Sequence, residues 1–394
     1  MVSQSGDYIF DVAALWLVLQ LTGDIFKVGL ATSTIFLPPV LIGPLAGVYV
    51  DKFNRRDIIL ASNIAQAVIV ASIAILYTLQ TLSFPVLLIL LFLLNAGAQF
   101  VRPSINAVIP GIVAKGDLAA ANGLFSISSS LNQIAGFGVG GLLILLLGVA
   151  VPIYYDSLSF LFAAASAVLI ARPLLDVPTT IRSELDKSAL GPESFWSKLR
   201  QGLQFIRSSP LLLELVGLAI VLNFFAGGIQ ALLAPYARNT IRGDAGTYGA
   251  MLAALSMGTV LGSVLVGKIE ARKYVGKLLF LGCMGIGAAI ALMGLTTVAY
   301  YSAALMLIVG ASAAIVNLPI QVLIQAKVPG NLLGRVFSSL GALVTIATPI
   351  AAITTGSIAT VLRIGPTFQL YGVLMLAATA GAYLVFRDVR EAKY

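Results

Sequence analysis

Residues 28–56 decide the fold, and they read VGLATSTIFLPPVLIGPLAGVYVDKFNRR. Their first 23 positions carry no charged side chain, whereas Asp51, Lys52, Arg55 and Arg56 follow within six positions. About 20 consecutive apolar residues are enough to cross the hydrocarbon core of a bilayer. The stretch therefore predicts one membrane-spanning helix that ends in a short basic loop.

The same alternation of long apolar segments and short polar breaks runs through the whole chain. Of the 394 residues, 59% belong to the hydrophobic set and 10% are charged, and the mean hydropathy is +1.00. Soluble domains have about 45–50% apolar and 25% charged residues, so a soluble globule is excluded. The pattern predicts an all-α polytopic membrane protein with twelve spans, at 3–21, 28–50, 57–79, 84–109, 122–147, 151–171, 211–234, 246–267, 278–298, 300–325, 336–361 and 365–386.

The basic residues predict the orientation of these spans. If the N-terminus lies inside the cell, 20 of the 24 Lys and Arg residues fall at the cytoplasmic side and 4 outside. Basic residues are retained on the cytoplasmic side, so we expect both termini there, in the plasma membrane of a prokaryote. This asymmetry accounts for the net charge of +8 without nucleic acid as a partner.

The two halves of the chain resemble each other. Pro, Phe and Ser recur at nearly the same spacing after the fourth and tenth spans, as Pro103, Phe125 and Ser126 and as Pro319, Phe337 and Ser338. Duplicated halves are typical of secondary transporters, which hold their substrate near the bilayer midplane. We expect a six-helix bundle over 1–171, a cytoplasmic linker over 172–209 and a second six-helix bundle over 210–394.

Four of the spans, the first and fourth of each half, carry polar residues on one helix face. Steps of three or four residues place such residues on the same face. Hydrogen bonds between helices would explain them, but the recurrence at every third span favours a shared substrate cavity. Together with neighbouring aromatics and Arg102, the predicted cavity residues are Tyr8, Trp16, Asn95, Gln99, Arg102, Asn223, Phe224, Gln230, Asn317 and Gln321.

Carboxylates inside a span are functional hypotheses by default, because burying a charge in a membrane is costly. Asp11 lies near the middle of the first span among aromatic residues, and apolar surroundings favour the protonated form of a carboxylic acid. Asp11 and Asp7 are the predicted proton-coupling residues; the alternative is an ion pair with Arg102. Asp156 lies only a few residues inside its span, so an interfacial or capping role is expected there.

Several residue types and motifs are missing from the sequence. There is no His, the usual proton relay and commonest transition-metal ligand, and the single Cys283 excludes a disulfide within the chain. No glycine-rich ATP-binding loop with Lys and Ser or Thr occurs. We therefore expect no metal, no cofactor, no catalytic residue and no enzyme activity, but transport that is passive or driven by an ion gradient.

The loop Gly47-Val48-Tyr49-Val50-Asp51-Lys52-Phe53-Asn54-Arg55-Arg56 resembles the signature loop of the major facilitator superfamily. Gly136-Phe137-Gly138-Val139-Gly140-Gly141 is similar to the superfamily's antiporter motif, with Phe137 in place of its proline. The resemblance implies alternating access between two bundles, with a cytoplasmic gate formed by Gly47, Asp51, Lys52, Arg55, Arg56, Asp117, Gly334 and Arg335. It also implies that Gly136, Gly138, Gly140 and Gly141 pack the fifth span closely against a helix of the other half.

Finer features resemble the macrolide-efflux and enterobactin-exporter branch of that superfamily. These include Ser5-Gly6-Asp7, Asp156-Ser157-Leu158-Ser159-Phe160 and Gly334-Arg335-Val336-Phe337. Relatives carry more residues before the first of these motifs, so we expect a trimmed or mis-assigned start; the alternative is a shortened first helix. The resemblance implies a monomeric exporter of amphipathic or hydrophobic small molecules, coupled to protons. Alternatives are a lysophospholipid flippase of the same fold and, from another class, a non-transporting receptor.

Overall fold

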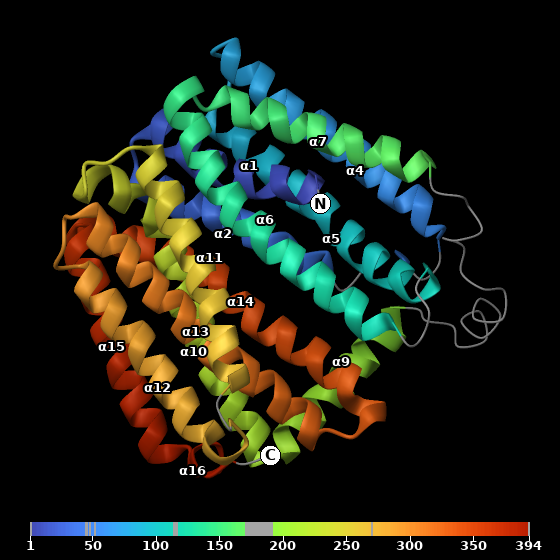
Figure 1. Cartoon of the computed structure of the whole chain (residues 1–394), viewed down its shortest axis with the longest axis vertical. Helices are drawn as coiled ribbons and strands as arrows, with labels where there is room; N and C mark the ends of the chain where they lie inside the picture. Colours follow the sequence, from blue (N-terminus) through green and yellow to red (C-terminus); the bar gives the residue numbers. More distant parts are fainter. Residues whose placement is uncertain are drawn as a thin grey trace. The chain divides into compact units, whose positions relative to one another are not determined.

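The computed structural model describes residues 2–43, 46, 49–50, 53–112, 117–169, 192–268 and 271–392. Within these ranges the chain is helical, with short turns and no strand (Figure 1). The first set of long helices comprises α1 (Val2–Thr22), α2 (Ile25–Leu41), α4 (Arg55–Thr78), α5 (Phe84–Ile112), α6 (Leu118–Leu147) and α7 (Ala150–Leu169).

The second set follows a helix in the predicted linker, α9 (Pro192–Ser208). It comprises α10 (Pro210–Pro235), α11 (Ala245–Lys268), α12 (Ala271–Met293), α13 (Ala299–Lys327), α14 (Gly330–Leu362) and α15 (Ile364–Val385). A short π-helix, η3 (Tyr236–Thr240), continues α10, and α16 (Arg387–Arg390) ends the described chain.

The predicted spans are confirmed to within a few residues at most of their ends. Ten of the described helices are long and apolar enough to cross a membrane. The other two members of the sets, α1 with 21 residues and α2 with 17 described residues, complete the twelve. The fold is therefore the all-α, twelve-helix fold of a polytopic membrane protein, as predicted.

Contacts divide the chain into two compact units. The first contains Met1–Thr22 and Thr34–Phe195, and the second contains Gly23–Ser33 and Trp196–Tyr394. Much of the predicted linker, residues 170–191, lies outside the described residues. The domain limits inferred from the sequence therefore stay a prediction.

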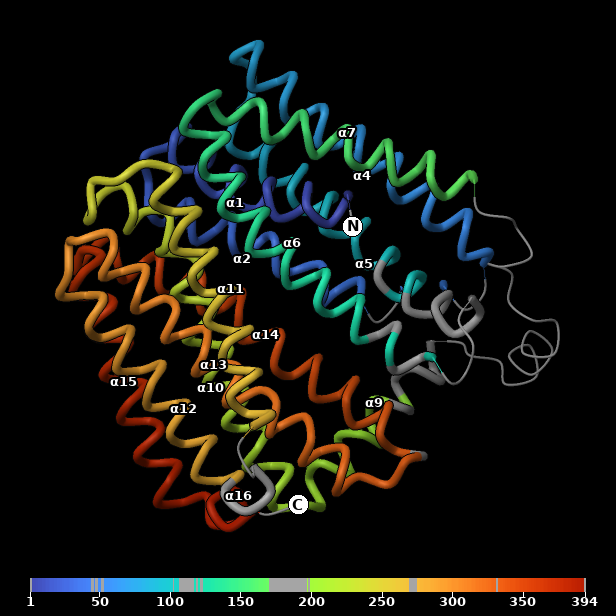
Figure 2. Tube along the Cα trace, in the orientation of Figure 1, coloured from blue at the N-terminus to red at the C-terminus, as the bar shows by residue number. Residues whose placement is uncertain are grey.

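Four helix pairs recur at the same positions in the two units. In the first unit α1 packs against α6 and α7, while α4 packs against α5 and α7, alongside which it runs in Figure 2. In the second unit α10 packs against α14 and α15, while α12 packs against α13 and α15. Counted along each set of six, these are the same positions, which agrees with the internal repeat seen in the sequence.

Glycines bring several of these helices into close contact. A Cβ atom built on Gly136 of α6 would lie 2.7 Å from Tyr8 Cβ, and one on Gly140 would lie 3.1 Å from Ile9 Cα. Both partners are on α1, so these glycines face a helix of their own unit and not one of the other half as expected. Their spacing of four residues places both glycines on one face of α6, so they contact the same neighbouring helix.

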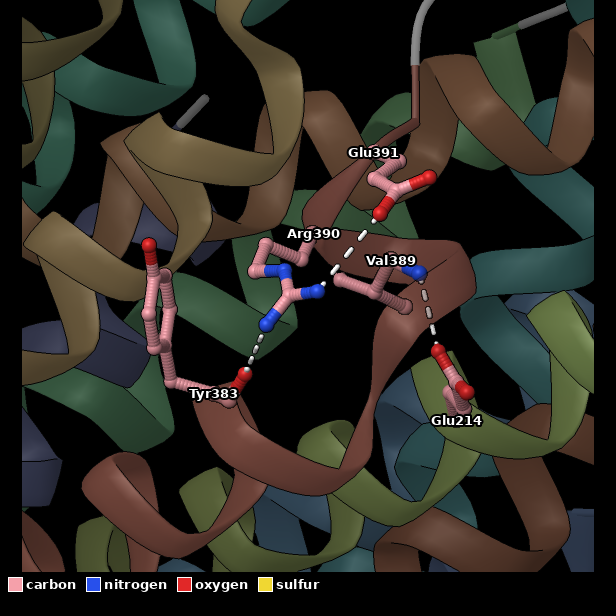
Figure 3. A network of polar contacts seen from close by, with 5 residues as sticks. All are labelled: Glu214, Tyr383, Val389, Arg390 and Glu391. Atoms are coloured by element: carbon pink, nitrogen blue, oxygen red, sulfur yellow. Dashed lines mark hydrogen bonds and ion pairs between the residues drawn. The ribbon is translucent and has the colours of Figure 1, made fainter.

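The end of the chain is fixed to the second unit by a polar network (Figure 3). Glu214 on α10 accepts a hydrogen bond of 2.8 Å from the backbone N–H of Val389 in α16. Arg390 donates to the carbonyl oxygen of Tyr383, and its guanidinium carbon lies 5.5 Å from the centre of the Tyr383 ring. Glu214 therefore satisfies an N–H group that a helix end would otherwise leave without a partner.

Candidate functional site

The candidate site is a cavity of about 160 Å³ inside the first unit. Helices α1, α2, α4, α5 and α7 all contribute to its wall. Apolar side chains, among them Phe10, Ile35, Leu94 and Phe160, form part of this wall. The polar residues that line it are Ser3, Asp7, Asp11, Asn63, Gln66, Asn95 and Asp156.

Helix α1 contributes three polar residues to the wall of this cavity. Ser3, Asp7 and Asp11 are spaced by four residues, so they share one face of the helix, and all three line the cavity. Asp7 is half-buried, but Asp11 is exposed. The Asp11 side chain is therefore less enclosed by protein than expected, although the buried Phe10 contributes to the same cavity wall.

Asp156 on α7 is the buried carboxylate of this cavity. Its side chain is 0% exposed, and the Ser159 hydroxyl donates to its Oδ1 at 3.2 Å. Its Oδ2 has no hydrogen-bond partner among the described residues. The expected interfacial role is thus wrong, because Asp156 faces α1, where Gly6 leaves room for it.

Three amide side chains from α4 and α5 donate hydrogen bonds to backbone carbonyls. Asn63 donates to the Ile59 carbonyl oxygen at 2.7 Å, and Asn95 donates to the carbonyl oxygen four residues before it at 2.9 Å. Gln66 donates to the Leu94 carbonyl oxygen at 3.5 Å. Since a carbonyl can only accept, these bonds assign the nitrogen of each amide and leave its oxygen as the remaining acceptor.

Two of these amides, Asn63 and Gln66, were not predicted from the sequence. Both are buried, with exposed fractions of 2% and 4%. The signal was present, because an Asn and a Gln three residues apart inside an apolar span share one helix face. Asn95, by contrast, was predicted as a cavity residue and lies on the cavity wall.

Three other predicted cavity residues of the first unit, Tyr8, Trp16 and Gln99, are not among the residues that line this cavity. Tyr8 packs edge-to-face against Phe137, with ring centres 5.3 Å apart. Trp16 is buried, with 6% of its surface exposed, and Gln99 donates to the Asn95 carbonyl oxygen. The Arg102 side chain lies outside the described residues, so its predicted role is not tested.

In the second unit, two of the predicted cavity residues contact other groups of the protein and three are exposed. Asn223 donates to the Ala219 carbonyl oxygen within its own helix, and the Phe224 ring stacks on Tyr371 with ring centres 6.1 Å apart. The remaining three side chains are exposed in the described structure: Gln230, Asn317 and Gln321. Their predicted contact with substrate stays a prediction.

Part of the predicted gate lies outside the described residues, namely Gly47, Asp51 and Lys52. Arg56, another residue of the predicted gate, donates to two carbonyl oxygens at the end of α7, at 3.0 Å from Nε and 2.6 Å from Nη2. The last carbonyls of a helix have no partner within the helix, which explains why they attract a guanidinium group.

The remaining gate residues lie at helix starts. Arg55 is half-buried at the first position of α4, and Asp117 is exposed directly before α6, where its side chain makes no capping hydrogen bond. Arg335, which follows Gly334 near the start of α14, donates to Oε1 of Gln201 on α9. The linker helix therefore supplies a partner for Arg335 that the sequence did not predict.

Comparison with known proteins places the chain among transporters. The profile of the family described as "transmembrane secretion effector" matches residues 1–393. Macrolide efflux protein A of Streptococcus pyogenes is 23% identical over 93% of this chain and 89% of that protein. Multidrug efflux pump Tap of Mycolicibacterium fortuitum is 25% identical over 95% of this chain and 91% of that protein.

Solved structures give the same fold. A crystal structure of a variant of the nucleoside transporter NupG aligns with a TM-score of 0.75, at 10% identity and over 98% of both chains. At this identity the likeness supports the fold alone. The match of the family profile, however, spans nearly the whole chain, and the protein therefore belongs to the transmembrane secretion effector family of major facilitator transporters.

Proposed function

We propose that the protein is a secondary active exporter of amphipathic or hydrophobic small molecules, driven by the inward flow of protons. The observation that carries this proposal is the carboxylate-lined cavity among the membrane helices of the first unit. Ionisable residues inside membrane spans mark ion and substrate pathways because their burial is otherwise unfavourable. The names of the relatives, a macrolide efflux protein and a multidrug efflux pump, support the direction and class of transport.

Asp11 and Asp7 are the proposed proton carriers. Both line the cavity one helical turn apart, and Asp11, the more exposed of the two, is proposed to exchange its proton with water that enters the cavity. Protonation neutralises a carboxylate and removes the cost of enclosing a charge away from water. Uptake of protons from outside and their release inside would then be coupled to alternating access of the two bundles.

The proposed substrates follow from the side chains available to bind them. An aromatic ring such as that of Phe224, which stacks on the buried Tyr371, offers an apolar surface, while amides such as Asn223 and Gln230 offer hydrogen bonds without charge. Ligand sites commonly combine a mostly apolar wall with a few polar groups. Cytoplasmic termini, a monomeric state and a gate at the signature loop belong to the same proposal.

Flux into proteoliposomes tests this function. The protein should accumulate a macrolide or a cationic dye when a pH gradient is imposed, and Asp11→Asn should abolish that response. Asp57→Asn is the matched control, since Asp57 is exposed at the first turn of α4 and does not line the cavity. If the unmodified protein transports at the same rate with and without a pH gradient, the proposed coupling is contradicted. Competition by lysophospholipid, with no response to soluble drugs, would select a lipid flippase instead.

A further inference from the structure

The wall of the cavity in the first unit is rich in oxygen atoms. Asn63, Gln66 and Asn95 each use one side-chain N–H in a hydrogen bond to a backbone carbonyl, and each amide also has an oxygen that can interact with a ligand. Asp156 adds a carboxylate, which can only accept hydrogen bonds when it is ionised. Such a set of oxygens suits a hard cation, because such cations bind carboxylate and amide oxygens.

Two of these oxygens have no partner although they are buried. Asp156 Oδ2 and Gln66 Oε1 are both inaccessible and accept no hydrogen bond from the described residues. Their residues are 0% and 4% exposed, and both line the cavity. A buried polar atom without a partner costs about 1–3 kcal/mol, and more if it is charged. A ligand that is positively charged or that donates hydrogen bonds would therefore stabilise these two oxygens.

The charges on the cavity wall favour a cation with a single charge. Three Asp residues and no Lys or Arg are among the described residues that line it. Yet no group of three or more Asp, Glu, His or Cys side chains in the described ranges is close enough to hold a metal ion together. Of the three carboxylates only that of Asp156 is buried, whereas Asp7 and Asp11 are less enclosed and have interactions of their own. One buried carboxylate combined with neutral amide oxygens is balanced by one positive charge.

We infer that this cavity is a binding site for a sodium ion, with Asp156 and Gln66 as its protein ligands. Measured in the same way, one water molecule needs a volume of about 10–15 Å³, so a cavity of about 160 Å³ has room for a sodium ion that keeps some of its water. This inference deepens the proposed function, on which any role of the ion in transport rests. Sodium binding is measured in detergent, where no ion gradient exists. The sodium site and the proposed transport function can therefore be refuted separately.

Thermal unfolding of the purified full-length chain in detergent tests this inference. Sodium chloride is titrated against N-methyl-D-glucamine chloride at constant ionic strength, with Trp16 fluorescence as the readout in a Trp196→Phe background. Since Trp16 and Trp196 are the only tryptophans, the signal then reports the first unit. A ligand at 100 times its Kd should raise Tm by about 5 °C or more.

Three variants assign the effect to the cavity. Asp156→Asn and Gln66→Leu should each lose the sodium-dependent rise in Tm, because each removes one ligand oxygen at nearly constant volume. Asp57→Asn should keep the rise. If Asp156→Asn fails to fold, Gln66→Leu and the displacement of radioactive sodium from the unmodified protein still decide the question.

Three results would overturn the inference. The first is an equal Tm in both salts with no displaceable radioactive sodium. The second is a sodium effect that survives both Asp156→Asn and Gln66→Leu. The third is a rise in Tm on acidification alone, without any sodium effect, which would mean that the cavity takes a proton and not a metal ion.

Discussion

Gly6 sets the distance between α1 and the buried carboxylate of α7, and Gly6→Ala tests that role. A Cβ atom built on Gly6 would lie 2.5 Å from Asp156 Oδ1 and 2.9 Å from Ser159 Cβ, and closer still to the Ser159 hydroxyl. Ordinary contacts of a Cβ atom begin at 3.4 Å. The side chains of α7 must therefore withdraw by about half an ångström to one ångström, or the two helices must separate.

The expected loss of stability follows from two opposing effects. Overpacking a well-packed interior costs about 1–3 kcal/mol. Replacing Gly by Ala within a helix stabilises the helix by about 0.5–1 kcal/mol. Gly123→Ala on α6 provides the matched control, since nothing described lies within 4 Å of a Cβ atom there. Gly6→Ala should thus be less stable than Gly123→Ala by about 1–3 kcal/mol.

The assay is unfolding in detergent followed by Trp16 fluorescence in the Trp196→Phe background. The difference in stability corresponds to a Tm lower by about 2–10 °C. Ser159→Gly combined with Gly6→Ala should recover part of the loss, because contacting residues interact non-additively. Equal stability of Gly6→Ala and Gly123→Ala would refute the close approach of α1 and α7.

Two further substitutions test contacts of the second unit, with labelling of the single, buried Cys283 as the measure of unfolding. Gly258→Ala places a Cβ atom 2.8 Å from a backbone carbonyl carbon of α13, so it should cost about 1–3 kcal/mol relative to Gly267→Ala, which meets open space among the described residues. Glu214→Leu removes the acceptor of the Val389 N–H and should lower the free energy of unfolding by about 1–3 kcal/mol. Glu214→Gln keeps an acceptor oxygen and should lower it less. Equal losses of stability in the two variants would contradict this role of the carboxylate.

The spans could be predicted from the sequence because continuous apolar runs are the signal of membrane helices. The helix ends were less accurate where charged residues extend a helix into water. The predicted span 278–298 corresponds to a helix that begins at Ala271, since Arg272, Lys273 and Lys277 are compatible with a helix but not with a hydrophobic segment. The linker helix α9 was missed for the same reason.

The candidate site was only partly predictable, because hydropathy gives the depth of a residue along its helix but not the direction of its side chain. Asp156 lies near the start of α7, which suggested the interface, yet its side chain is fully buried against Gly6. The partners of Arg56 are backbone carbonyls 111 and 112 residues further along the chain. Such contacts depend on the packing of distant helices, which one sequence does not reveal.

The three carboxylates of the cavity differ in burial, and this difference separates two roles that one cluster could otherwise share. The Asp11 side chain is exposed on the cavity wall, whereas Asp156 is fully buried and lacks a partner at Oδ2 among the described residues. If Asp11 couples protons and Asp156 holds sodium, Asp11→Asn should abolish the response to a pH gradient while sodium still raises Tm. Asp156→Asn should remove the sodium effect on Tm. A single shared site predicts instead that each substitution abolishes both responses, so the pair of variants distinguishes two sites from one.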